Sequence, residues 1–183
     1  MANDAKDITA ETFGLVIAYL LPGIVGTVGL SFWSKTAKTA LQAFNTEQAN
    51  VNLLLLYLFC SLAVGLLIAA LRGLIFENWM IRLRPVGSRG LTNTEFSSLS
   101  VESKLAAFRA AVDAHYRYHQ CWGGMVVALP VLYLGWLREK FSEVATPDLL
   151  SATALFLVFE AVCVWAAWNA YTKYIDRSRR ILT

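Results

Sequence analysis

Residues 13–33 read FGLVIAYLLPGIVGTVGLSFW, a stretch of 21 residues without a charged side chain. At 1.5 Å per residue a helix of this length extends for about 32 Å, which is enough to cross a hydrocarbon core about 30 Å thick. Three similar stretches follow at 51–76, 121–137 and 149–168. Backbone groups in lipid must pair within the chain, and no strand-like alternation is present. We therefore expect an all-α protein with four transmembrane helices, built as a single domain over 1–183.

The composition of the chain also favours a membrane protein. Of its 183 residues 57% are hydrophobic and 16% are charged, against about 45–50% and about 25% in soluble domains. The mean hydropathy is +0.50. The net charge of +3 is too small and too scattered for a protein that binds nucleic acid. Three cysteines without a C-x-x-C pair indicate free thiols, so we expect no disulfide framework, no metal site and no cofactor.

The distribution of lysine and arginine predicts the orientation of the four helices. With four crossings, both termini and the middle loop lie on one side of the membrane, and that side carries twelve Lys and Arg residues. The opposite side carries four, namely Lys35, Lys38, Arg138 and Lys140. Because positive loops stay inside, we expect both termini in the cytoplasm and the protein in the cell inner (plasma) membrane.

The segment that precedes the third apolar stretch predicts a helical stalk. Residues 95–122 contain no proline or glycine, and apolar or histidine side chains recur at alternating spacings of four and three. The members of this seam include Leu105, Phe108, Val112, His115 and His119. We expect one helix from about 98 to about 137, whose first half projects from the membrane within a cytoplasmic insertion at 77–120.

The fourth helix keeps the same rhythm beyond the bilayer. Its repeating positions are Val164, Trp168, Tyr171, Ile175 and Ser178. The extended halves of the third and fourth helices run antiparallel on one side of the membrane. They can therefore pair with each other within one chain or build an oligomer.

Two histidines of the seam allow chemical alternatives to simple packing. His115 and His119 are four residues apart and share a helix face, which suits a metal pair or a contact that weakens when both rings are protonated. No third ligand is fixed, so packing is favoured and no metal is expected. The spacing from Arg109 to His115 resembles the Arg…His motif of HEPN ribonucleases, and this resemblance implies a nuclease, which we rank last.

Polar and small residues inside the membrane supply the candidate functional positions. Gly23, Gly26 and Gly29 form a drifting face that allows close helix packing or lines a pore. Glu160 is charged at a depth where a charge costs at least about 2.5 kcal/mol, so it should face other helices or water. It can be protonated and bonded to a neighbouring helix, line a cation path, or act as a proton relay or catalytic acid. Ser61 at similar depth can offer it a hydrogen bond.

Basic residues at the expected cytoplasmic surface are candidates for contacts with lipid headgroups or with a partner protein. They are Arg82 and Arg84 in an interfacial segment, and Lys173, Arg177, Arg179 and Arg180 in the tail at 173–183. Arg72 lies near the end of the second apolar stretch and is expected to extend toward the headgroups.

Three functions remain open from these residues. The first is a homo-oligomeric channel-like or membrane-perturbing effector, most simply a tetramer, that is regulated through its stalk. The second is a membrane anchor or sensor subunit that recruits a cytosolic protein through the stalk and the basic tail. A membrane enzyme ranks third, because no catalytic set is present, and we expect no enzymatic activity.

The size and the expected topology of the chain also resemble those of a known family. The chain contains LLPGIVG at 20–26, FRAAVDAHYRYH at 108–119 and the basic tail. In size and topology it resembles the small four-helix membrane components of bacterial phage-defence systems, the Kiwa-type membrane subunits. The resemblance implies an oligomer in the inner membrane that partners a cytosolic protein in antiviral defence.

Overall fold

The computed structural model describes residues 14, 16–42, 51–83, 102–141 and 145–182, and this part of the chain is helical throughout apart from short connections. The elements in chain order are η1 (Val16–Leu20), α2 (Leu21–Ser31), α3 (Lys35–Gln42), α4 (Val51–Arg72), η3 (Gly73–Glu77), α5 (Asn78–Leu83), α7 (Glu102–Ala111), η6 (Val112–Tyr116), α8 (Arg117–Lys140) and α9 (Thr146–Leu182). The elements η1, η3 and η6 are single π-helical turns.

The helices have the length and composition of membrane spans. Among the described residues three helices qualify, at Val51–Ile75, Arg117–Lys140 and Pro147–Ile181. A fourth is present if Val16–Ser31 and Lys35–Gln42, which meet at an angle of 115°, count as one broken span. The expectation of an all-helical chain is therefore confirmed for the described residues, which contain three to four helices long and apolar enough to cross a membrane.

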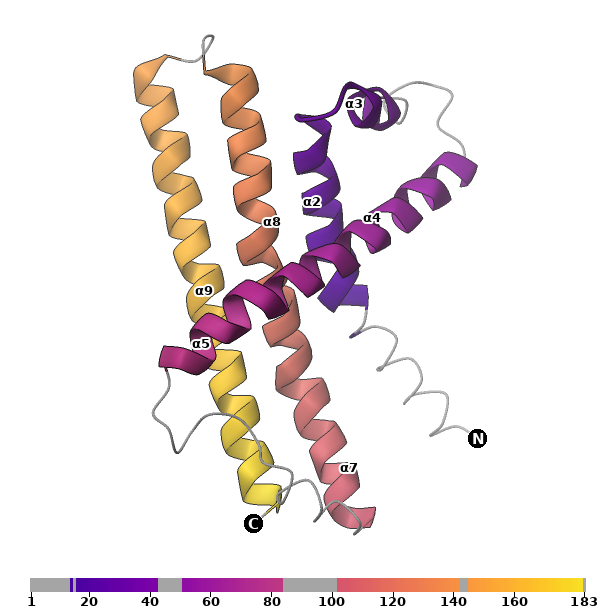
Figure 1. Ribbon diagram of the computed structural model, residues 1–183, viewed down its shortest axis with the longest axis vertical. Helices are drawn as coiled ribbons and strands as arrows, with labels where there is room; N and C mark the ends of the chain where they lie inside the picture. The colour runs from indigo at the N-terminus through magenta and orange to yellow at the C-terminus, as the bar shows by residue number, and fades with distance from the viewer. Residues whose placement is uncertain (1–13, 15, 43–50, 84–101, 142–144, 183) are drawn as a thin grey trace.

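The long helix expected from about 98 to about 137 is observed from residue 102 onward. Within the described residues α7, η6 and α8 follow one another without a break from Glu102 to Lys140. α9 then returns antiparallel to this helix along its whole length, and α7, η6 and α8 all pack against it (Figure 1). We call these four elements the long hairpin. The π-helical turn at Val112–Tyr116 was not expected, because the regular spacing of the seam predicts an unbroken α-helix.

α8 is the central helix of the structure. It contacts α2 and η1 on one side, α9 on another, and α4, which crosses the molecule obliquely (Figure 1). α2 begins with Pro22 in its first turn, directly after the π-helical turn η1. Proline lacks the N–H that a regular helix would need there, which accounts for the wider turn that precedes it.

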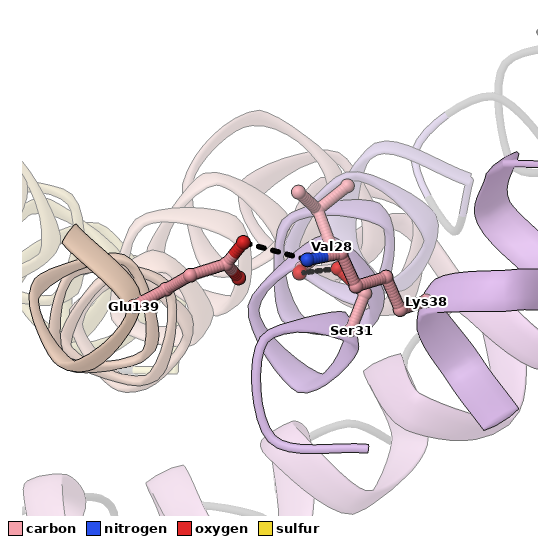
Figure 2. Close-up of polar contacts among 4 residues, drawn as sticks. All are labelled: Val28, Ser31, Lys38 and Glu139. Carbon is pink, nitrogen blue, oxygen red and sulfur yellow. Dashed lines mark hydrogen bonds and ion pairs between the residues drawn. The ribbon is translucent and has the colours of Figure 1, made fainter. Parts of the chain in front are cut away.

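Contacts to α8 hold the bend between α2 and α3. The Nζ atom of Lys38 lies 2.6 Å from Oε1 of Glu139, and the indole N–H of Trp33 donates to the carbonyl of Val131 at 3.3 Å. The guanidinium of Arg138 lies 5.2 Å from the centre of the Trp33 ring. Figure 2 shows the Lys38 side chain extending toward Glu139. The bend therefore lies at the end of the molecule where α8 terminates.

The end of α2 has its own polar contact. The hydroxyl of Ser31 donates to the carbonyl of Val28 at 2.6 Å (Figure 2). This bond satisfies one of the last carbonyl groups of α2, which lack partners inside the helix. The apolar stretch at 13–33 thus ends as a helix at Ser31, close to its expected limit.

Arg72 corrects one expectation from the sequence. The side chain is only 5% exposed, although it was expected to extend toward lipid headgroups. Ser61, Gly65, Ile68 and Arg72 are the buried residues of α4, and their spacing places them on one face of that helix. Ile68 contacts α8 near Gly124, one turn before Arg72. Arg72 is therefore buried on the face of α4 that packs against other helices.

Candidate functional site

A compact aromatic core surrounds His119 in the half of the long hairpin that contains its free end, away from the turn between α8 and α9. This side chain is 0% exposed, and its Nδ1 atom lies 3.0 Å from the carbonyl oxygen of Ala167 in α9. A carbonyl oxygen only accepts, so Nδ1 carries the proton and donates. The ring centre lies 4.9 Å from that of Tyr171 and 5.9 Å from that of Tyr116. His119 therefore connects α8 to α9 by a hydrogen bond and by ring contacts.

The aromatic core continues toward the free end of the hairpin through Tyr174. Its ring centre lies 5.0 Å from Tyr116 and 6.3 Å from Phe108 of α7. On α9 the neighbouring core residues are Ala167, Tyr171 and Ile175. The two predicted seams thus pair within one chain, which was one of the two alternatives that the sequence left open. Leu105 and Val112, the other seam residues, are half-buried in α7 and η6.

His115 lies in a different environment from His119. It belongs to the π-helical turn η6, and its Nε2 atom is buried without a hydrogen-bond partner in the described part of the chain. Burial lowers the pKa of His115 below its ordinary value of 6.5, and the positive charges of Arg177 and Lys173 on α9 lower it further. The same charges would repel a metal cation. Among the described residues no group of three metal-ligating side chains forms around either histidine.

The lowered pKa of His115 predicts a pH-dependent stability of the hairpin end. Between the folded-state pKa and 6.5 the unfolded chain binds more protons than the folded chain, so stability rises with pH in this range. We expect the thermal midpoint of the detergent-solubilised protein to fall as the pH is lowered from about 7.5 through 6.5, because the unfolded-state histidine gains its proton there. The measurement is circular dichroism at a series of pH values.

The matched variant for this experiment is His115→Gln. The chain has two histidines, and His119 is present in both proteins, so the difference between their pH profiles reports His115 alone. Arg177→Gln removes one of the repelling charges, so it should raise the folded-state pKa of His115 toward 6.5 and make the fall in the thermal midpoint smaller. Identical profiles for the native and His115→Gln proteins would contradict the prediction.

The outer surface of the hairpin end is basic. Arg109 on α7 and Lys173, Arg177 and Arg180 on α9 are exposed, while Arg179 is half-buried. Asp176 is an exposed acidic residue in the same stretch of α9. We call the exposed basic side chains, Arg109, Lys173, Arg177 and Arg180, the basic end. Arg82 of α5 is also exposed, and Arg84 lies outside the described residues.

Glu160 lies in a groove that is lined by side chains of α9 and α5. The groove has a volume of about 540 Å³, and apolar side chains line it together with Glu160. They include Trp165 and Trp168 of α9 and Trp79 of α5. The Oε2 atom of Glu160 is buried and has no hydrogen-bond partner among the described residues. We call this feature the Glu160 groove.

Ser61 does not serve as a partner of Glu160 in this structure. Its hydroxyl is buried and, within the described ranges, also lacks a hydrogen-bond partner. The backbone of Ser61 lies against Gly23, at the crossing of α4 with α2. The expected hydrogen bond between Ser61 and Glu160 is therefore absent from the described part of the molecule.

Gly23, Gly26 and Gly29 of the first apolar stretch lie at contacts between helices of this chain. Gly23 faces the carbonyl of Ser61, Gly26 faces Ile68, and Gly29 faces the backbone of Leu132 in α8. A side chain at any of these positions would meet a neighbouring helix. The described structure uses this glycine face for packing within one chain.

Sequence reasoning missed several of the residues that form these sites. Trp79 joins the Glu160 groove from α5, and Tyr116 and Tyr174 complete the aromatic core. The tyrosines could have been found, because Tyr174 is three residues from Tyr171 and Tyr116 is three residues from His119. Trp79 could not, since its place in the groove beside α9 depends on how distant parts of the chain are arranged. Comparison with protein-family models, curated proteins and solved structures finds no match to this chain.

Proposed function

We propose that this chain is a four-span membrane protein of the cell inner membrane, whose long hairpin presents the basic end to the cytoplasm and there recruits a cytosolic protein. The observation that carries the proposal is the length of the hairpin. The 37 residues of α9 extend for about 55 Å, whereas a hydrocarbon core is about 30 Å thick. About 25 Å of paired helix is therefore available outside the lipid.

The composition of α9 supports this division. Between Asp148 and Lys173 the helix carries a single charged residue, Glu160, whereas Lys173 and the residues after it include four of the cations named above. The lysine and arginine distribution of the whole chain favours the cytoplasm for this end and for both termini. The bent pair α2 and α3 supplies the fourth crossing in this arrangement.

The aromatic core supports a recognition role for the basic end. The rings of Phe108, Tyr116 and Tyr174 connect α7 and η6 to α9, so the two helices hold each other in place beyond the apolar segment. A surface on such a rigid pair is preorganised, which lowers the entropic cost of binding. Its exposed cations suit a partner with an acidic surface. The proposal assigns no enzymatic activity to the chain.

A channel-like or membrane-perturbing effector is the second candidate. The Oε2 atom of Glu160, buried without a described partner inside the apolar segment, favours it. The helices of one chain pack directly on one another at glycine contacts, so a conducting path would require several copies, most simply four. The role in bacterial antiviral defence is a prediction that rests on the resemblance to Kiwa-type membrane subunits alone.

Photo-cross-linking in living cells distinguishes the two candidates. A photoreactive residue at Arg177, which is exposed at the basic end, should cross-link to a cytosolic protein. The same residue at Leu157, which is 58% exposed and lines the Glu160 groove, should not cross-link to any protein. Leu155, which is 69% exposed in the same apolar segment, is the matched control. Cross-links between copies at Leu157 but not at Leu155, with none to a cytosolic protein at Arg177, would favour the channel and contradict the recruitment role.

A further inference from the structure

The Glu160 groove combines an acidic group with aromatic rings in an apolar setting. Trp79, Trp165 and Trp168 contribute three indole rings to its lining, and the remaining side chains are aliphatic. The faces of indole rings attract cations, more strongly when water is excluded. A volume of about 540 Å³ lies within the range of pockets that hold small molecules, about 300–1,000 Å³.

The carboxyl group of Glu160 lacks a counterpart in the described structure. Its Oε2 atom is buried and unpaired, and such a group is costly unless a donor or a cation approaches it. The nearest charged residues on the same helix are Asp148 and Lys173, about 18 Å and about 20 Å away along the helix axis at 1.5 Å per residue. In the four-span arrangement proposed above, the lipid headgroups at the two surfaces are comparably distant. A cation other than a proton that neutralises Glu160 must therefore be one that dissolves in the interior of the membrane.

We propose that the Glu160 groove binds a small hydrophobic cation, with the positive centre placed between the Glu160 carboxylate and the indole rings. The apolar lining accommodates the body of such a ligand, and charge complementarity selects it over an anion of the same size. This binding is independent of the proposed recruitment of a partner, because it concerns the membrane segment of α9 and not the basic end.

The test uses the full chain in lipid nanodiscs and two probes of nearly equal size, the tetraphenylphosphonium cation and the tetraphenylborate anion. Equilibrium dialysis should detect binding of the cation above the level of empty nanodiscs, and no such excess for the anion. Glu160→Gln, which preserves the shape of the side chain, should weaken cation binding about tenfold. Glu139→Gln is the matched control, since this carboxylate pairs with Lys38 at the far end of α8.

A second variant tests the groove independently, in case the substitution at Glu160 disturbs folding. Trp165 is 68% exposed, so Trp165→Leu should leave the fold intact while it removes one ring from the groove, and the affinity for the cation should fall. A loss of threefold or more in Glu160→Gln, with Glu139→Gln unchanged, supports the proposal. A smaller loss in Glu160→Gln, or equal binding of the two probes by the native protein, overturns it.

Discussion

Replacing Gly23 or Gly65 by alanine is expected to lower the free energy of unfolding by about 3 kcal/mol, the upper range for adding a methyl group to a close-packed contact. A Cβ atom on Gly23 would overlap the carbonyl oxygen of Ser61, and one on Gly65 would overlap the carbonyl oxygen of Tyr19. Both obstacles are backbone atoms, so they cannot move aside as a flexible side chain would. The added methyl group must therefore push α4 away from η1 and α2.

The matched control is Gly73→Ala, at the start of the π-helical turn that follows α4. A Cβ atom built there meets nothing within 4 Å. Alanine also favours helix by about 1 kcal/mol over glycine, so this variant should be as stable as the native protein or slightly more stable. Unfolding by sodium dodecyl sulfate in mixed micelles, followed by circular dichroism, measures the three variants together. Equal stabilities of Gly23→Ala and Gly73→Ala would show that α2 and α4 do not pack as closely as described.

The helical architecture could be predicted from the sequence because its causes are local. Apolar stretches such as 51–76 are long enough to cross a bilayer, and in lipid a helix satisfies its own backbone groups. The seam that contains Phe108 and His119 predicted the continuation of α8 into α7, since regular spacing of buried residues along one face is a property of the segment itself. These features depend on few contacts between distant parts of the chain.

The rest of the structure depends on such contacts and was not predicted. The 115° bend between α2 and α3 lies beside contacts from Lys38 to Glu139, 101 residues later in the chain. The inward direction of Arg72 follows from which face of α4 meets α8. The indole lining of the Glu160 groove requires Trp79 to reach α9 from another helix. The π-helical turn at Val112–Tyr116 leaves no trace in the spacing of apolar residues.

Truncation of His119 is expected to be the most damaging single change in the long hairpin. His119→Ala removes a fully buried ring that contacts Tyr116 and Tyr171, and the cavity and lost burial together should cost about 3 kcal/mol. It also removes the hydrogen bond to the carbonyl of Ala167. His119→Phe restores a ring of similar size but not the hydrogen bond, so it should cost about 1 kcal/mol.

Tyr118→Ala is the control on the same helix, because Tyr118 is 53% exposed and should tolerate truncation within about 0.5 kcal/mol. Unfolding by sodium dodecyl sulfate gives the stabilities, and hydrogen exchange of residues 102–116 shows where the structure opens. In His119→Ala these amides should exchange faster, since α7 and η6 pack on α9 beyond the lost ring. The acceleration should not depend on protein concentration, because the aromatic core forms within one chain. If His119→Ala were no more destabilising than Tyr118→Ala, or if protection depended on concentration, the hairpin end would owe its order to contacts between copies.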